Sequence, residues 1–297
     1  MANRFFEGAA HAAAYAKFRP QPPTSLIERI VSFLKEGYSG TLDVAADVGC
    51  GTGQSTEVLT PYFENVTGLD ISAAQVSEAA KLSLSNPKIC FKVSGAEALP
   101  FKENSVQLVT ASQACHWFDM PAFYKEVDRI LVPGGVLALY GYLLPRPVHK
   151  HHSEELYGLL DHVYTVETEG CWGSARKDVD EAYSNDRFII PYPGIVRDET
   201  HYVDKMMSVS DVTGELTSWS GFQNFKEKNG ELAAQKILDD FQNGFMKLLD
   251  VPTAPEDTQH PDVSSEYKFL KQAVKDECIV ADDELSLILI VNVSEVQ

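Results

Sequence analysis

Asp-Val-Gly-Cys-Gly-Thr-Gly-Gln, residues 47–54, follows directly on an apolar run that begins at Leu42. Gly49, Gly51 and Gly53 have no Cβ, so the backbone can turn sharply and a ligand can lie against it. We expect a helix to begin at about Gly53. The unpaired N–H groups and the positive dipole end at the start of that helix would suit a phosphate or a carboxylate. The stretch therefore predicts a nucleotide-binding turn between a buried strand and a helix.

The residues around this turn favour a ligand that carries an amino group over a dinucleotide. The dinucleotide fingerprint is Gly-x-Gly-x-x-Gly, whereas this chain has Gly-x-Gly-x-Gly with Asp47 in front of it. A carboxylate there would repel a pyrophosphate but could hold an ammonium group. A second apolar run, 66–69, ends in Asp70, whose carboxylate can accept hydrogen bonds from both ribose hydroxyls. S-adenosylmethionine has both groups and is the ligand we predict; a nicotinamide site and a ligand-free structural turn are the alternatives.

Length and composition set limits on partners and compartment. The 297 residues suit one large domain, or a domain with a lid. The net charge of −18 disfavours nucleic acid and anionic membranes as partners. The five cysteines form no close pairs, which favours a reducing compartment over a disulfide framework. Because no apolar run approaches about 18 residues and the N-terminus lacks a secretory apolar core, we expect a cytoplasmic protein. The oligomeric state is not indicated.

Strand-like and helix-like stretches alternate between residues 41 and 142. Ser72 begins a helix with a Ser-x-x-Gln capping pattern that reaches Gln75, and Asp119 is expected to cap another. The strand-like runs are 42–48, 66–69, 89–93, 106–111 and 136–140. This alternation predicts a doubly wound, Rossmann-like α/β fold with a mostly parallel seven-stranded sheet, helices on both faces, and ligands at the carboxyl ends of the strands.

Two regions outside this repeat divide the chain. Residues 1–40 are helix-like and are expected to form an N-terminal helical lid segment, whereas residues 41–145 form the ligand-binding core. Residues 146–265 are less regular and aromatic, and we interpret them as an insertion that forms an α-rich substrate lid. Residues 266–297 should supply a helix and a final strand that complete the core sheet.

The motifs of residues 40–145 resemble class I S-adenosylmethionine-dependent methyltransferases. The turn and Asp70 carry this resemblance together with Gly95–Phe101 and Pro133–Gly135. Shorter motifs resemble, more narrowly, the eukaryotic trans-aconitate methyltransferase group, whose members methylate small-molecule carboxylates. These motifs are Tyr15 with Arg19-Pro20, Cys115–Asp119, Trp172-Gly173 with Arg176, and Thr217–Ser220.

The resemblance implies the residues that bind the cofactor. They are Asp47, Gly49, Gly51, Gly53, Asp70, Ile71, Ala96, Glu97, Tyr15 and Arg19. One position departs from the pattern: many relatives have an acidic side chain where this chain has Gly95, and that side chain reaches the adenine amino group. Backbone groups at Ala96, with Glu97, would have to bind the adenine edge here.

The chemistry of methyl transfer suggests which residues hold the acceptor. A carboxylate acceptor is ionised at neutral pH and needs a cationic or hydrogen-bonding cradle, whereas a hydroxyl or ammonium needs a base, usually histidine. His116 and Gln113 follow the fourth strand and are the predicted catalytic residues. Three residues are predicted to bind the substrate: Trp117, Trp172 and Arg176. Arg176 is expected to contact the carboxylate of the substrate.

Each of these residues also has a purely structural interpretation. His116 could hydrogen-bond the backbone at a helix start, Gln113 could cap a turn, and Arg176 could form a surface ion pair. The run His149–His152 contains Lys150 and lacks a nearby cysteine, so no metal site is predicted.

The sequence predicts a methyltransferase that esterifies a small organic acid. Two alternatives stay open: a small-molecule N- or hydroxyl O-methyltransferase with His116 as base, and a catalytically silent adenosylmethionine-binding module.

Overall fold

The structure is a computed structural model that describes residues 9–192, 194–198, 201–250, 279–285 and 288–293. The chain divides into two compact units. The first comprises Met1–Leu143, Ser174–Val203 and Glu284–Gln297, and the second comprises Leu144–Gly173 and Asp204–Asp283.

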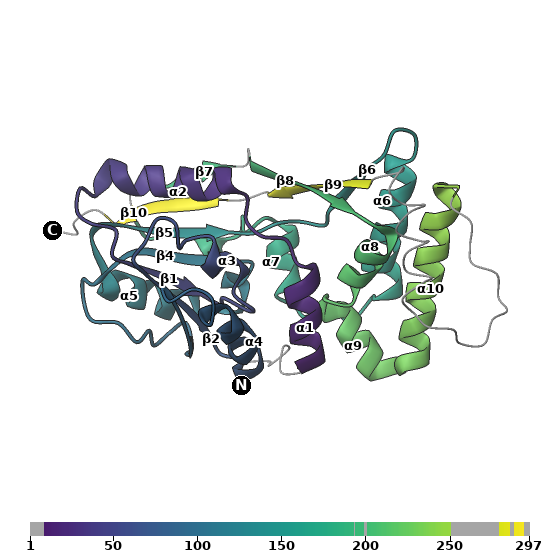
Figure 1. Cartoon of the computed structure of the whole chain (residues 1–297), viewed down its shortest axis with the longest axis horizontal. Helices are drawn as coiled ribbons and strands as arrows, with labels where there is room; N and C mark the ends of the chain where they lie inside the picture. The colour runs from purple at the N-terminus through teal and green to yellow at the C-terminus, as the bar shows by residue number, and fades with distance from the viewer. Residues whose placement is uncertain (1–8, 193, 199–200, 251–278, 286–287, 294–297) are drawn as a thin grey trace. The chain divides into compact units, whose positions relative to one another are not determined.

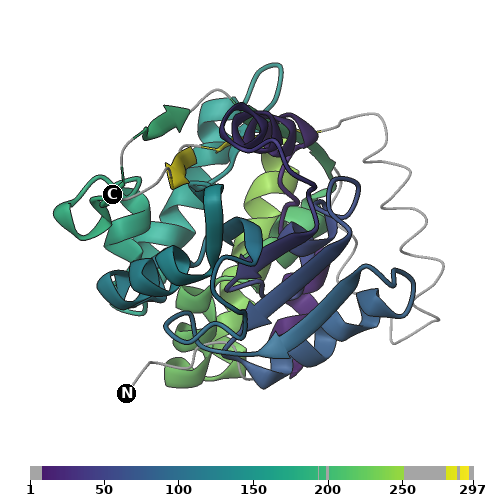
Figure 2. The ribbon, with the colours of Figure 1, turned by 90° about the vertical axis from the view of Figure 1, so that its left-hand side faces the viewer.

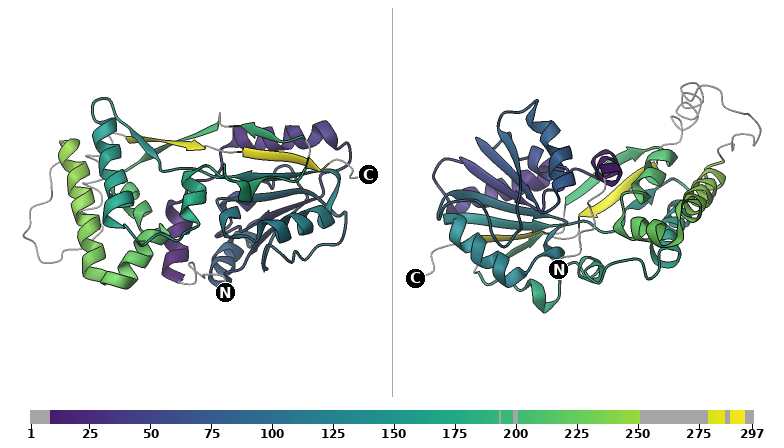
Figure 3. Two further views of the ribbon diagram at one scale, coloured as in Figure 1. Left: turned by 180° about the vertical axis from the view of Figure 1, so that it is seen from behind. Right: turned by 90° about the horizontal axis from the view of Figure 1, so that it is seen from below.

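A sheet with the strand order β3-β2-β1-β4-β5-β10-β7 forms the centre of the first unit (Figure 1). Its strands are β1 (Val44–Val48), β2 (Asn65–Asp70), β3 (Ile89–Val93), β4 (Val106–Ser112), β5 (Leu131–Tyr140), β7 (Val196–Asp198) and β10 (Ile288–Val293). Strands β1 to β5 pair in parallel, whereas β10 runs antiparallel to both β5 and β7. The parallel strands fan out with the twist of the sheet (Figures 2 and 3). The five-stranded parallel core confirms the predicted Rossmann-like α/β fold.

Helices cover both faces of this sheet because successive strand residues point to opposite sides. Ala45 and Leu108 pack with α2 (Thr24–Gly37), whereas their neighbours Ala46 and Val109 belong to the apolar cluster of α5 (Met120–Ile130). Figure 1 shows α2 and α5 on opposite sides of the strands. The other helices near the glycine turn are α1 (Ala9–Phe18), α3 (Gln54–Glu57) and α4 (Ala73–Ser83), and α1 packs against α4.

Helix α2 differs from the expectation that residues 1–40 form a lid. Leu26, Ile30 and Leu34 recur every four residues, lie on one face of the helix and are fully buried against the sheet. Because these side chains form part of the central core, α2 belongs to the scaffold. Helix α1 lies near the glycine turn, since the Tyr15 ring approaches Gly51 and α1 packs against α4.

The predicted insertion of residues 146–265 is divided in the structure. Its middle part, 174–203, belongs to the first unit and contains α7 (Arg176–Asp180) and the 3-10 helix η3 (Asp186–Phe188). Tyr192 shows why: its ring is buried beside Tyr124 of α5, and its hydroxyl donates to the Tyr124 carbonyl over 2.8 Å. Such apolar contacts hold this segment on the core.

The second unit is rich in helices. It contains α6 (Ser153–His162), the π-helix η2 (Val163–Glu167), α8 (Val209–Leu216), α9 (Ser220–Asn229) and α10 (Glu231–Leu248). Leu156, Leu216 and Phe245 are fully buried in its apolar core. Strands β6 (Arg146–Val148), β9 (Ile279–Leu285) and β8 (His201–Met207) form a small sheet in the order β6-β9-β8 (Figure 1).

Two sequence expectations concern residues 266–297. The helix predicted at the start of residues 266–297 falls outside the described residues. Strand β10 lies within the segment expected to form the final strand and pairs with β5. Among the described residues, no helix has the length and apolar character needed to cross a membrane.

A cavity-creating substitution tests the place of α2 in the core. Ile30→Ala should lower the free energy of unfolding by about 2–5 kcal/mol, because Ile30 is fully buried against the sheet. Urea denaturation followed by circular dichroism measures the change. The exposed Glu28 of the same helix provides the control, since Glu28→Ala should change the free energy by less than about 0.5 kcal/mol. Equal effects of the two substitutions would show that α2 packs loosely.

Candidate active site

The glycine turn adopts a conformation that side chains would prevent. Gly49 has φ +72°, and a Cβ there would lie 2.4 Å from the Cβ of Ala114. Gly53 has φ +95°, and a Cβ there would lie 2.8 Å from the ring of Phe91. The N–H of Gly49 donates to the carbonyl of Leu69 over 2.7 Å, which fastens the turn to the end of β2. The helix expected after the turn is only the four-residue α3, so its dipole is smaller than the sequence suggested.

Asp70 holds the other side of the turn. One carboxylate oxygen accepts the N–H of Gly51 over 2.9 Å, and the other accepts the N–H of Ser72 over 2.8 Å. An ionised carboxylate is also the kind of acceptor that a ribose hydroxyl needs. Ile71, next in the chain, is exposed and presents apolar surface beside this carboxylate.

Asp47 lies fully buried beneath the turn. Its two carboxylate oxygens accept hydrogen bonds from the hydroxyls of Thr56 at 2.7 Å and Thr110 at 2.9 Å, which link β1 to α3 and β4. The pKa of Asp47 is raised to about 6, chiefly by burial and to a lesser extent by the negative charge of Asp70, while the two hydroxyls act in the opposite direction. A positively charged ligand nearby would favour the ionised carboxylate, which fits the predicted contact with an ammonium group.

Helix α1 brings Tyr15 and Arg19 to the turn. The Tyr15 ring lies 3.5 Å from the point that a Cβ on Gly51 would occupy, and the Gln54 amide donates to the Tyr15 carbonyl over 3.3 Å. The Arg19 guanidinium lies 5.0 Å from the centre of the Tyr15 ring and donates to the Tyr142 hydroxyl over 3.0 Å. Both predicted residues therefore lie beside the turn.

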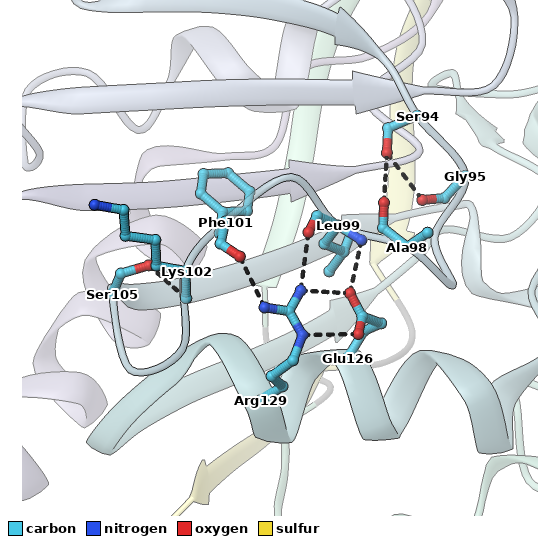
Figure 4. A network of polar contacts seen from close by, with 9 residues as sticks. All are labelled: Ser94, Gly95, Ala98, Leu99, Phe101, Lys102, Ser105, Glu126 and Arg129. Atoms are coloured by element: carbon cyan, nitrogen blue, oxygen red, sulfur yellow. Dashed lines mark hydrogen bonds and ion pairs between the residues drawn. The ribbon is translucent and has the colours of Figure 1, made fainter.

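The loop that contains Ala96 and Glu97 is fastened to α5 (Figure 4). Glu126 accepts the N–H of Leu99 over 2.8 Å, and Arg129 donates to the carbonyl of Leu99 over 2.9 Å. Glu126 and Arg129 also pair with each other at 2.6 Å, and this hydrogen bond lowers the pKa of Glu126.

Within this loop, Ala96 is buried, and the exposed Glu97 accepts the N–H of Asp119 over 3.0 Å. The loop is therefore held in one shape, although sequence reasoning identified neither member of the pair that holds it. An acidic and a basic residue spaced i, i+3 on a helix were the only signal available.

His116 lies on the 3-10 helix η1 (Cys115–Trp117) after β4 and is almost fully buried. Its Nδ1 lies 2.9 Å from the Tyr183 hydroxyl. Burial, together with the positive charges of Arg176 and Arg187, lowers the pKa of His116 to about 3. The imidazole is therefore neutral at physiological pH.

Arg187 holds η1 in place from the segment 174–203. Its guanidinium donates to the carbonyls of His116 at 3.0 Å and Phe118 at 2.8 Å, and it pairs with Asp178. Sequence reasoning missed both Arg187 and Tyr183, since neither belongs to a motif and each lies about 70 residues from its partner.

Gln113 uses its side chain on the backbone. It has φ +50°, its amide nitrogen donates to the Tyr142 carbonyl over 2.8 Å, and its amide oxygen accepts the Tyr142 N–H over 3.1 Å. Because both ends of the amide are engaged, the predicted direct catalytic contact is not supported. Gln113 instead positions Tyr142, the residue that accepts from Arg19.

Two predicted substrate residues lie in the first unit. Arg176 opens α7 and pairs with Asp180 at 2.9 Å. Burial lowers the pKa of Arg176; Asp180 opposes this shift, and the positive charge of Arg19 adds to it. The Trp117 ring lies 4.8 Å from that of His116, and the residue is 36% exposed.

Trp172 lies in the second unit and packs inside it. Its indole N–H is within hydrogen-bond distance of the Tyr164 carbonyl and the Thr168 hydroxyl, both at 2.9 Å, and its ring lies 5.9 Å from that of Trp219. A Cβ on Gly221 would lie 2.4 Å from the Trp172 ring. These contacts show that Trp172 packs in the core of this unit. They do not support the predicted contact with the substrate.

The histidine run is built by local contacts. The ring of His149 stacks on that of His152 with centroids 5.3 Å apart, and its Nδ1 accepts the N–H groups of His151 and His152. Across the described ranges, no group of three or more His, Cys, Asp or Glu side chains is arranged to hold a metal ion.

Comparisons with known proteins agree with this geometry. A family model described as a methyltransferase domain matches residues 46–139. A Dictyostelium discoideum protein named as a methyltransferase is 30% identical over 244 residues, which cover 80% of this chain and 88% of that protein. A Saccharomyces cerevisiae protein named as the S-adenosylmethionine-dependent methyltransferase CRG1 is 35% identical over 159 residues, or 52% of each chain.

A solved structure supports the fold. The structure titled as a type II methyltransferase from Anaeromyxobacter dehalogenans superposes with a TM-score of 0.66 at 23% identity, covering 94% of this chain and all of that one. The relatives confirm the predicted enzyme class and the predicted cofactor, S-adenosylmethionine.

The raised pKa of Asp47 predicts a pH-dependent affinity for S-adenosylmethionine. The cation should stabilise the ionised carboxylate, so affinity should rise with pH through about 6 and level off above it. Calorimetric titration between pH 5 and 8 measures this. The neutral fragment 5′-methylthioadenosine should lack the dependence, and Asp47→Asn should abolish it for the full cofactor. An unchanged pH profile in Asp47→Asn would rule out this coupling.

Proposed function

The chain belongs to the class I S-adenosylmethionine-dependent methyltransferases, and on that premise we propose that it methylates the carboxylate of a small organic acid. The proposal agrees with the resemblance to the trans-aconitate methyltransferase group. Its main support is the cationic surroundings of His116, the residue that follows β4.

The residues of the glycine turn fit the cofactor. A Cβ on Gly51 would meet the Tyr15 ring at 3.5 Å, and the Asp70 carboxylate accepts the Gly51 N–H on the same turn. We propose that Asp70 binds the ribose hydroxyls, Asp47 favours the ammonium group, and the fastened loop at Ala96 and Glu97 binds the adenine edge. S-adenosylmethionine supplies an electrophilic methyl group when it is bound there.

Positive charge gathers around His116. Arg176 and Arg187 both lower its pKa, and Arg19 acts in the same direction on Arg176. A guanidinium is the side chain best suited to hold a carboxylate, because it presents paired N–H donors in one plane. The same charges disfavour an ammonium acceptor. Arg176 and Arg187 are each paired with an aspartate, Asp180 and Asp178, and their charges still lower the pKa of His116. We propose that this remaining positive charge favours an anionic acceptor over an amine.

The Tyr183–His116 pair adds an uncharged donor to this cradle. Burial raises the pKa of the Tyr183 hydroxyl well above its ordinary range, so the hydroxyl keeps its proton and can donate it to Nδ1 of His116. The neutral imidazole then carries its own proton on Nε2. We propose that this N–H, with Arg176, orients the acceptor carboxylate without neutralising it.

A carboxylate acceptor needs no general base, since it is ionised and its oxygen attacks the methyl group directly. The enzyme has to align the two reactants and exclude water, effects worth up to roughly 7–11 kcal/mol.

The alternative with His116 as base has weaker support. A general base works best with a pKa near the operating pH, whereas the pKa of His116 is about 3. Proton uptake would also place a third positive charge beside Arg176 and Arg187. A hydroxyl or amine acceptor would therefore have to lose its proton by another route.

Removal of the Arg176 charge should weaken acid binding. Arg176→Leu should raise KM for the acid by roughly 10–100-fold, the worth of a charge-assisted hydrogen bond, and leave the Kd of the cofactor unchanged. Lys177→Leu provides the control, because Lys177 is the exposed neighbouring cation on α7. A screen of small acids with labelled methyl donor supplies the assay, and a methyl ester is identified by alkaline release of methanol. Turnover of amines or phenols without any ester would overturn the proposal.

Replacement of His116 distinguishes two roles for this residue, a hydrogen-bond donor and a general base. His116→Asn should lower kcat by less than about tenfold, because only one neutral hydrogen bond is lost. A loss of about a hundredfold or more would indicate general-base catalysis. Thermal denaturation of the variant, run alongside the kinetics, shows whether the buried site still folds.

A further inference from the structure

The start of helix α4 contains half of a capping box. The Ser72 hydroxyl accepts the N–H of Gln75 over 3.3 Å, as the Ser-x-x-Gln pattern predicts. In the reciprocal half, the Gln75 side chain would accept the N–H of Ser72. Asp70 takes that N–H instead, over 2.8 Å. The amide oxygen of Gln75 is therefore not needed for capping.

This amide oxygen is buried without a hydrogen-bond partner. Gln75 is 2% exposed, and among the described residues nothing donates to its Oε1. Most buried polar side-chain atoms in native proteins have a partner, because an unsatisfied one carries the full cost of its desolvation. A group from outside the chain that donates to Oε1 would remove this cost.

Gln75 lies at the cofactor turn. Its Oε1 is 3.9 Å from the point that a Cβ on Gly51 would occupy, and the Tyr15 ring borders the same point. The N–H of Gly51 is the group that Asp70 holds. Gln75, Asp70 and Tyr15 therefore converge on one glycine.

We propose that Gln75 accepts a hydrogen bond from a ribose hydroxyl of S-adenosylmethionine, beside the bond to Asp70. The ribose presents two adjacent hydroxyl donors, so Gln75 can accept from one of them while Asp70, which also holds the backbone N–H groups of Gly51 and Ser72, accepts from the ribose too. A neutral amide oxygen matches a neutral hydroxyl, whereas the cationic ammonium group is better served by the carboxylate of Asp47. This inference concerns only cofactor binding and is independent of the methyl acceptor.

A binding role and a packing role predict opposite effects of an apolar replacement. Leucine is similar in size to glutamine and carries no polar atom to desolvate. If Gln75 serves the cofactor, Gln75→Leu should stabilise the ligand-free protein while it weakens cofactor binding. If Gln75 serves the structure, the substitution should destabilise the protein.

Calorimetry with two ligands locates the bond. We expect Gln75→Leu to bind both S-adenosylhomocysteine and 5′-methylthioadenosine about tenfold more weakly, and to unfold about 2–4 °C higher without ligand. The second ligand keeps the ribose but lacks the amino acid. If only the affinity for S-adenosylhomocysteine falls, the hydrogen bond lies at the amino-acid end of the cofactor. If the affinity for neither ligand falls, Gln75 makes no hydrogen bond to the cofactor. Both results overturn the proposal.

Deoxy ligands provide a double-mutant cycle. The 2′-deoxy and 3′-deoxy forms of 5′-methylthioadenosine should each bind the unmodified protein more weakly than 5′-methylthioadenosine does. For one of the two deoxy ligands, the affinity should be the same in Gln75→Leu as in the unmodified protein. Additive losses for both would overturn the ribose assignment. Gln235→Leu, at an exposed position of α10, provides the matched control. Gln75→Met takes the place of Gln75→Leu if the leucine variant fails to fold.

Discussion

The hydrogen bond from the Gly51 N–H to Asp70 fixes the geometry on which the cofactor site depends. The turn cannot rely on a long helix behind it, because α3 has four residues. Instead, Asp70 holds the turn from β2 and Asp47 holds α3 from β1. This solution brings two carboxylates close together, and the charge of Asp70 contributes to the raised pKa of Asp47. In the proposed binding mode a cationic cofactor relieves that repulsion, so the features that shape the turn also favour a positively charged ligand.

Negative charge lies at the glycine turn, at Asp47 and Asp70, whereas positive charge lies around His116. With a net charge of −18, the protein as a whole repels anions. Salt screens that field over about 8 Å at physiological ionic strength, whereas the cluster of Arg176 and Arg187 acts on His116 in a buried environment. Under the proposed function, this local charge rather than the net charge favours the acceptor. A carboxylate beside these arginines would complement the positive sulfonium of the donor, and both charges disappear as the ester forms.

Sequence reasoning succeeded where the information was local. The turn, Asp70 and the Ser72 cap lie within about 25 residues, and each has a geometric requirement that a few residue types meet. It failed where contacts cross the chain: no periodicity links Tyr183 to His116, and Trp172 proved to pack within a separate unit. The positive φ of Gln113 was equally hidden, since it is not a glycine. The burial of α2 was different, because its four-residue apolar spacing was present in the sequence and was read as a lid segment.

Unfavourable features gather at the two halves of the site. Gln113 and Tyr183 both have left-handed backbone conformations, at φ +50° and +53°, and both side chains approach Gly141. Strain of this kind costs about 1–3 kcal/mol per residue and persists only where the surroundings fix it. Here the largely buried strands β1 and β4 supply that rigidity, since Gln113 directly follows β4. Part of the stability of the core therefore offsets the cost of holding strained residues in place beside Gly141 and His116.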